Sequence, residues 1–398
     1  MPRPARHMES VGEALSIKYN NVVYELQESG ADVIVLSLGE AFFDLPLHDF
    51  GSLPQPAIFH YSHSRGLPAL RERLASYYGD RYGVPVDPAD EIIVTAGSKI
   101  AIQMSLMTLL DPGDEVIVHE PAWVSYVEQV RLCHGAPVTV PYEVPVAGLE
   151  AFVTPRTRAI VLNYPNNPRG QILGADEWER LHDLAERRDL FLLCDEAYSD
   201  FLPDGERFVS GGLGDPGKRH TLICNSMSKN YGMSGWRVGY VIGRRDVISQ
   251  ILKVNQHLVT CPATILSHYL AEHFHDLLEV TAPQIRAVVD KRAAVVRELE
   301  RIGLEALPGR ATFYLFVSIA PSALGSEAFC TRLLTERHVA AVPGIGYGKS
   351  CDAFIRVSVG TETMKRTIAG LRAIKALIDE TAAAETGPPR RVAAGGDR

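Results

Sequence analysis

Short apolar runs alternate with segments of helical spacing between residues 91 and 242, and this alternation is what most constrains the fold. Residues 91–95 are rich in β-branched side chains, and apolar residues then recur at helical spacing from 99 to 110. Nearly continuous apolar strands separated by helices predict an α/β fold with a mostly parallel central sheet covered on both faces. The remaining segments of this pattern are apolar runs at 115–118, 158–162, 190–194, 221–224 and 238–242, and a helical stretch at 175–188.

The pattern changes after about residue 285 and predicts a second, smaller α+β domain. Its expected elements are helices at 283–303, 326–338 and 362–382 and strands at 312–317 and 353–359. A chain of 398 residues is long enough for two cores. We expect four parts: an N-terminal segment (1–45) that packs with the small domain, a large cofactor-binding domain (46–284), a small C-terminal domain (285–384), and a disordered tail rich in Pro, Gly and Arg (385–398).

Composition limits the classes of function. The net charge of −8 argues against nucleic acid or an anionic membrane surface as the main partner. Six cysteines are scattered without a CxxC pair, which favours reduced thiols over a disulfide framework and gives no metal site. No apolar segment follows the basic N-terminus as in a signal peptide, and no apolar run approaches the ~20 residues that span a bilayer. We expect a cytoplasmic protein that acts on small molecules.

A lysine among small residues is the first candidate for chemistry. Lys229 ends Ser226-Met227-Ser228-Lys229, directly after an apolar run, and Arg237 follows eight residues later. A lysine amine near apolar surroundings loses its proton more easily and can form a Schiff base with a carbonyl. A serine hydroxyl and an arginine guanidinium suit a phosphate monoester, so the segment indicates pyridoxal phosphate. Taken alone, the segment is explained equally well by a polar loop with a surface lysine.

Further polar residues follow the ends of other apolar runs. Because ligands bind at the carboxyl ends of parallel strands, these residues are expected to converge. Asp195 would pair with the ring nitrogen of the cofactor, and Asn167 is presented by a tight turn. Gly97-Ser98-Lys99 opens a helix whose free backbone N–H groups favour phosphate, and Trp123 could stack on an aromatic ring. Each of these residues also has an ordinary explanation. Asp195 could cap a turn, and Asn167 could lie in a surface turn. Gly97-Ser98 is a common helix start, and Trp123 could be a core residue.

Their order and spacing resemble the class I/II aminotransferases of the fold-type I pyridoxal-phosphate family, in particular the bacterial aspartate/aromatic aminotransferase-like branch. The resemblance runs from about residue 36 to about residue 376. It implies that Lys229 carries the cofactor, that Asp195 pairs with its ring nitrogen, and that Tyr198 acts with them as a catalytic residue. The other cofactor contacts that it implies are Asn167 with Tyr198 at the phenolic oxygen, Trp123 on the ring face, and Gly97, Ser98, Lys99 (through its backbone N–H), Ser226 and Arg237 at the phosphate.

The resemblance also implies substrate contacts and an oligomeric state. Arg356 matches the residue that clamps the substrate α-carboxylate, and Gly39 lets the backbone approach the same carboxylate. Tyr61 matches a tyrosine that reaches the phosphate of the neighbouring subunit, so we expect a homodimer with shared active sites.

The implied reaction is the ping-pong transfer of an amino group between an L-amino acid and a 2-oxo acid, with Lys229 as general base. The same cofactor cage also serves lyases, cyclopropane-forming synthases and arginine cyclases or oxidases, which stay as alternatives. A ligand-sensing transcription regulator is disfavoured because there is no room for a DNA-binding domain before residue 36. A catalytically inactive protein is disfavoured because the catalytic residues of the family pattern, such as Lys229 and Asp195, are all present. Two departures from the family pattern, Phe42 and Arg169, are expected near the substrate side. We identify no second arginine that would select a dicarboxylate, so aspartate is not assigned as the substrate.

Overall fold

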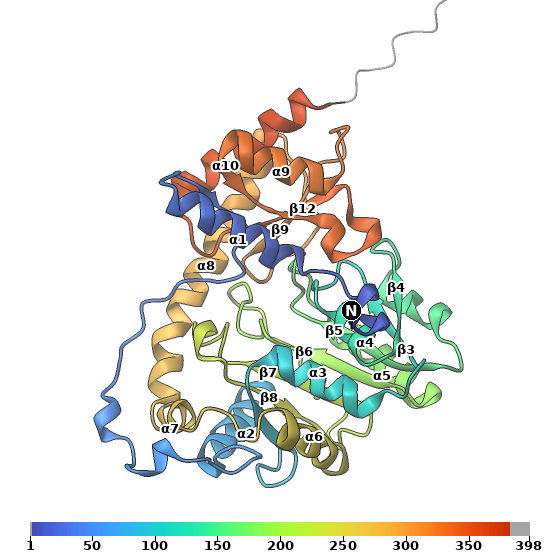
Figure 1. Ribbon diagram of the computed structural model, residues 1–398, viewed down its shortest axis with the longest axis vertical. Helices are drawn as coiled ribbons and strands as arrows, with labels where there is room; N and C mark the ends of the chain where they lie inside the picture. The colour runs from blue at the N-terminus through green and yellow to red at the C-terminus, as the bar shows by residue number, and fades with distance from the viewer. Residues whose placement is uncertain (1, 383–398) are drawn as a thin grey trace, which may run out of the picture.

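The computed structural model describes residues 2–382, in which a long sheet and a smaller one are joined by a helix that runs between them (Figure 1). Within these residues the large sheet has seven strands in the order β2-β8-β7-β6-β5-β3-β4. Strand β8 runs opposite to the other six, so the expected α/β fold with a mostly parallel sheet is confirmed. The strands are β2 (Ile92–Thr95), β3 (Glu115–His119), β4 (Ala136–Val140), β5 (Thr157–Asn163), β6 (Phe191–Asp195), β7 (Thr221–Ser226) and β8 (Gly239–Ile242).

Helices cover both faces of this sheet because successive strand residues point to opposite sides. Ile92 and Val94 of β2 join one hydrophobic core, whereas Ile93 between them joins another. The first core contains residues of α2 (Pro68–Tyr82), α5 (Ala175–Arg188) and α7 (Thr264–Glu272). The second contains residues of α3 (Ser98–Leu109), α4 (Tyr126–Leu132) and α6 (Arg245–Leu258).

A third core forms around the smaller sheet, which lies at the top of Figure 1. Strands β9 (Tyr314–Ser318), β11 (Val342–Pro343) and β12 (Phe354–Ser358) pair antiparallel, with β12 in the middle. The N-terminal segment packs here, since α1 (Leu15–Glu28) supplies Tyr19 and Val23 to this core. Its β1 (Ile34–Val35) pairs with β10 (Val339–Ala340), and α9 (Ser326–Arg337) and α10 (Met364–Glu380) complete the layer.

Helix α8 (Phe274–Ile302) connects the two parts and differs from the sequence prediction. It begins more than two turns before Pro283, where the helix was expected to start. Proline in a helix interior removes a hydrogen bond, but Phe274 and Leu277 are fully buried in the first core of the large sheet and hold the first turns in place. The later turns bury Ile285 and Val289 in the core around the smaller sheet. We propose that these cores correspond to two domains that share α8.

Two other expectations concern the ends of the chain and the membrane. Residues 383 and 384 of the expected small domain and the expected disordered tail, 385–398, lie outside the described residues. None of the helices in the described part of the chain combines the length and the apolar character that crossing a bilayer requires.

Candidate active site

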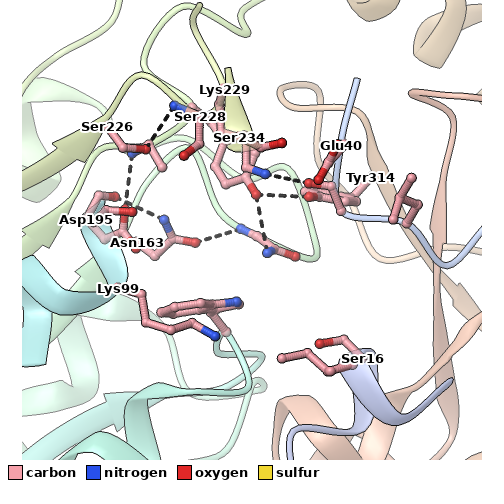
Figure 2. Close-up of a pocket in the computed structure, with 18 of the residues that line it drawn as sticks. Ser16, Glu40, Lys99, Asn163, Asp195, Ser226, Ser228, Lys229, Ser234 and Tyr314 are labelled. Carbon is pink, nitrogen blue, oxygen red and sulfur yellow. Dashed lines mark hydrogen bonds between the residues drawn. The ribbon is translucent and has the colours of Figure 1, made fainter. Parts of the chain in front are cut away.

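A cavity of about 350 Å³ lies at the carboxyl ends of β5, β6 and β7, where the small sheet and α1 face the large one (Figure 2). The polar residues that follow separate strands in the sequence meet there, because parallel strands end at one edge of the sheet. Of the cofactor and substrate contacts predicted above, Gly97 and Tyr61 are missing from the lining. The predicted residues that line the cavity are Gly39, Ser98, Lys99, Trp123, Asn167, Asp195, Tyr198, Ser226, Lys229, Arg237 and Arg356.

The amine of Lys229 points into this cavity from the turn that follows β7. Its Nζ donates a 2.5 Å hydrogen bond to the carbonyl oxygen of Gly39, on the opposite wall. Burial lowers the pKa of Lys229 to about 8, and the positive charges of Arg356 and Arg237 act in the same direction. A substantial share of this amine is therefore neutral near physiological pH, as a nucleophile or general base requires.

The carboxylate of Asp195 ends β6 and is almost fully buried. Its Oδ2 accepts a 2.6 Å hydrogen bond from the Tyr126 hydroxyl, and its Oδ1 accepts a 3.1 Å bond from the Ala197 N–H. Burial raises the pKa of Asp195, whereas these two bonds and the charge of Lys229 oppose that rise. Both donors are neutral, so the site retains the negative character that would favour a protonated ring nitrogen beside it.

Cations and a helix N-terminus gather on another wall. Gly97 has φ of +92° and directly precedes α3, and a Cβ added to it would lie 2.5 Å from Nη2 of Arg237. The absence of a side chain thus allows the guanidinium to approach the free N–H groups of α3. The Lys99 amine lies 5.1 Å from the Trp123 ring, and burial together with the Arg237 charge lowers its pKa. This arrangement fits a phosphate group.

The guanidinium of Arg356, on β12, is buried and its hydrogen-bond partners are neutral. It donates to the carbonyl oxygen of Ser37 at 2.5 Å and to Oδ1 of Asn167 at 3.3 Å. Its Nε is buried without a hydrogen-bond partner among the described residues, and its guanidinium carbon lies 4.5 Å from the ring centroid of Tyr314. A buried cation without an acidic partner favours an incoming anion, and a planar guanidinium suits a carboxylate.

Tyrosine and asparagine side chains connect Arg356 with the strand ends. The hydroxyls of Tyr198 and Tyr314 are 2.9 Å apart, and Nδ2 of Asn167 donates to the Tyr198 hydroxyl at 3.5 Å. Asn163 holds the turn in place, because its Oδ1 accepts a 2.8 Å bond from the Asn167 N–H. Burial raises the pKa of Tyr198 well above its usual value, so its hydroxyl stays protonated and can donate.

Several residues of the site were missed from the sequence. Tyr126 and Tyr314 reach it through tertiary contacts, although Tyr126 stands in the same segment as Trp123. Asn163 opens the Asn-Tyr-Pro-Asn-Asn-Pro segment and could have been found there. The N-terminal segment also lines the cavity with Ser16, Ile17, Asn20 and Leu38, and Ser16 and Lys99 face it from different sides (Figure 2).

Arg169 and Phe42, which were expected near the substrate side, make no part of the cavity wall. The side chain of Arg169 instead donates from Nε to the carbonyl oxygen of Pro308 at 2.8 Å, and so supports the turn from outside. Phe42 is 65% exposed and borders a separate hollow beside α1. Tyr61 is 85% exposed and does not reach the cavity of its own chain.

Known proteins match this chain over most of its length. The family described as aminotransferase class I and II matches residues 32–371. Aromatic-amino-acid aminotransferase 2 of Thermococcus litoralis is 31% identical over 350 residues, which cover 85% of this chain and 90% of that protein. The arginine–pyruvate transaminase of Pseudomonas aeruginosa is 33% identical over 358 residues, covering 85% and 88%.

A solved structure agrees with these sequence matches. The aspartate aminotransferase of Thermus thermophilus with maleate superposes with a TM-score of 0.86 at 32% identity, covering 95% of this chain and 100% of that one. The resemblance inferred from the Lys229, Asn167 and Asp195 segments and the fold expected from it are confirmed. This chain belongs to the class I and II aminotransferase family, whose members are enzymes of the transferase class.

Proposed function

We propose that this aminotransferase binds pyridoxal 5′-phosphate and moves an amino group between an L-amino acid and a 2-oxo acid in two half-reactions through Lys229. One observation carries the proposal: four groups border one cavity. They are a lysine amine of lowered pKa, a buried carboxylate, a cationic wall at a helix N-terminus, and a buried arginine whose hydrogen-bond partners among the described residues are neutral. The names of the relatives specify aromatic amino acids, aspartate, and arginine with pyruvate. They support an amino acid as the donor but do not select one amino acid.

The residues divide into those that hold the cofactor and those that act on the substrate. Ser98, Ser226 and Arg237 would hold the phosphate, with the N–H groups of Lys99 and its neighbours at the start of α3. Trp123 would cover the ring, Asp195 would keep its nitrogen protonated, and Asn167 and Tyr198 would donate to its oxygen. When bound, the cofactor supplies an aldehyde for the amino group and a ring that delocalises the electrons of a broken Cα bond.

The chain itself supplies binding and proton transfer. Arg356 would grip the α-carboxylate of the substrate and thereby fix the Cα–H bond relative to Lys229. The neutral Nζ of Lys229 would then take the proton from the substrate Cα. Gly39 keeps the backbone close to both groups, since its carbonyl oxygen already accepts from Lys229 and an added Cβ would lie 3.9 Å from the Arg356 guanidinium.

We also propose that the active form is a homodimer. Tyr61 is exposed and lies outside the cavity of its own chain, which supports a role at the site of a second copy.

The test is to add single amino acids to the purified, cofactor-loaded protein while its absorbance, 2-oxo acid and ammonia are measured. We expect a change in the cofactor absorbance, stoichiometric 2-oxo acid, and no ammonia. The Lys229→Ala variant should stay folded and lose turnover by at least about 100-fold. Release of ammonia or consumption of oxygen would favour a lyase, cyclase or oxidase instead, and absence of any cofactor band would overturn cofactor binding by Lys229.

A further inference from the structure

A buried carboxylate joins the large sheet to the segment that leads into the Arg356 strand. Glu120 directly follows β3 and is 4% exposed. Its Oε1 accepts a 3.0 Å hydrogen bond from the Lys349 N–H, and its Oε2 accepts from the Ser350 N–H at 2.9 Å and from the Ser350 hydroxyl at 2.5 Å. Charge-assisted bonds of this kind are stronger than neutral ones, so the carboxylate fixes this segment firmly.

The backbone of the same region is adapted to this contact. Gly348 has φ of +140°, a conformation that favours glycine, and a Cβ added there would collide with the Glu120 carboxyl group. Two residues beyond Glu120, the Ala122 N–H donates a 2.8 Å hydrogen bond to the carbonyl oxygen of Tyr347. The chain from Glu120 to Ala122 therefore runs along the chain from Tyr347 to Ser350 and holds it at both ends.

This held segment packs directly on Arg356. The ring centroid of Tyr347 lies 5.6 Å from the guanidinium carbon of Arg356, within the range of a cation–π contact. Tyr347 is 1% exposed and packs against Phe316 on the neighbouring strand, so its ring has little room to move independently. A shift of the Tyr347–Ser350 segment would accordingly be transmitted to the guanidinium.

We propose that Glu120 is a positioning residue for Arg356: it anchors the Tyr347–Ser350 segment to the large sheet and so sets where the substrate carboxylate is gripped relative to Lys229. The inference rests on the proposed function. Removal of the carboxylate would take the shared acceptor from the partly buried N–H groups of Lys349 and Ser350, and the segment would no longer be held to the large sheet at this point. A displaced guanidinium would make poorer hydrogen bonds to the substrate carboxylate, so substrate binding would be weakened.

Single-turnover measurement of the amino-acid half-reaction separates substrate binding from the chemical step. We expect Glu120→Ala to raise the dissociation constant of the amino acid about tenfold, with a smaller change in the maximal rate and an unchanged cofactor absorbance. The milder Ser350→Ala variant keeps both backbone bonds and loses one hydroxyl bond, so we expect a rise of about threefold.

A second buried glutamate, at the other end of β3, provides the matched control. Glu115 opens β3, is 5% exposed, and accepts from the Thr154 hydroxyl at 2.6 Å and from Nε of Arg156 at 3.0 Å, all within the large domain. Glu115→Ala should lower the melting temperature but leave amino-acid binding unchanged. The inference is overturned if folded Ser350→Ala and Glu120→Ala both bind the amino acid as the wild type does, or if Glu115→Ala weakens binding equally. A wild-type protein that forms no 2-oxo acid would overturn the proposed function and this inference with it.

Discussion

The Tyr126 hydroxyl donates a 2.6 Å hydrogen bond to Oδ2 of Asp195, and this bond joins the first residue of α4 to the last residue of β6. Burial raises the pKa of the Asp195 carboxyl, and the Tyr126 bond is the largest of the influences that lower it. Tyr126 itself is buried, and burial raises the pKa of its hydroxyl well above the usual value, so it remains a donor. The tyrosine thus helps to keep Asp195 ionised.

Replacement of Tyr126 by phenylalanine should destabilise the ionised carboxylate of Asp195 relative to the protonated form. Since the lost bond favours the charged carboxylate, the pKa of Asp195 should rise further, and activity should be lost at a higher pH than in the wild type as the pH is lowered. A bond to a charged group contributes about 1.5–3 kcal/mol, so we expect a loss in kcat/KM of at least about tenfold. The measurement is the pH profile of kcat/KM.

Tyr77→Phe is a suitable control for this experiment. Tyr77 is also buried and donates to a carboxylate, that of Asp200, at 2.8 Å, but neither residue lines the active-site cavity. The control should change stability without moving the acid limb of the profile. An equal displacement of that limb in both variants would show that the Tyr126 bond has no specific effect on Asp195.

The lowered pKa of Lys229 predicts how the cofactor-free protein reacts with aldehydes. The pKa of this amine is about 8, so the amine is mostly protonated at lower pH and mostly neutral and nucleophilic at higher pH. The rate of reaction with pyridoxal should therefore rise with pH and level off above about 8, whereas an ordinary lysine would continue to gain reactivity up to about 10.4. Stopped-flow absorbance on the cofactor-free protein provides this profile.

The Lys229→Ala variant separates this amine from the other lysines. It should lack the rapid phase and retain only the slow reaction of exposed lysines. If the rapid phase persists in the variant, or if its rate keeps rising well beyond pH 8 in the wild type, burial does not depress the pKa of this amine.

Much of the large domain and its site could be predicted from the sequence because both depend on local patterns. Apolar runs define buried strands, and polar residues directly after them, such as Asp195 and Ser226, must lie at one edge of a parallel sheet. The position of Lys229 follows from the same reasoning. Helix α5 has the predicted bounds, Ala175–Arg188, because its apolar residues recur at regular helical spacing between clear breakers.

The features that were missed depend on tertiary contacts. Tyr126 meets Asp195 because α4 packs over the end of β6, and Tyr314 meets Tyr198 only when the small sheet docks on the large one. The first turns of α8 were missed because Pro283 is an ordinary helix start in sequence terms, and packing of Phe274 outweighs it. The contact of Arg169 with the carbonyl oxygen of Pro308 was also missed, because nothing in the sequence near Arg169 indicates it.

Substitution of Gly97 by alanine should weaken cofactor binding. The added Cβ would lie 2.5 Å from Nη2 of Arg237. The residue would also keep φ of 92° and ψ of 163°, a conformation that is essentially restricted to glycine and costs other residues about 1–3 kcal/mol. Arg237 would have to withdraw from the start of α3, so we expect the dissociation constant for pyridoxal phosphate to rise at least about tenfold. Equilibrium titration followed by absorbance measures this constant.

Gly235→Ala is the control for this substitution, because Gly235 lines the same cavity but has no atom within 4 Å of an added Cβ. Its affinity for the cofactor should equal that of the wild type. Equal affinity in Gly97→Ala would show that the contact between Gly97 and Arg237 is not needed for the phosphate.

Mixing two inactive variants would test whether Tyr61 serves the active site of a second copy. A Lys229→Ala protomer supplies an intact Tyr61, and a Tyr61→Ala protomer supplies an intact Lys229. If the tyrosine acts on the neighbouring site, each mixed dimer has one complete site and one site that lacks both residues. Random exchange of subunits should then restore about one quarter of wild-type activity, because about half of the dimers are mixed. If Tyr61 acts within its own chain, mixing restores nothing beyond the average of the two variants. Full activity of Tyr61→Ala alone would show that the tyrosine is dispensable, and its exposure of 85% would then need another explanation.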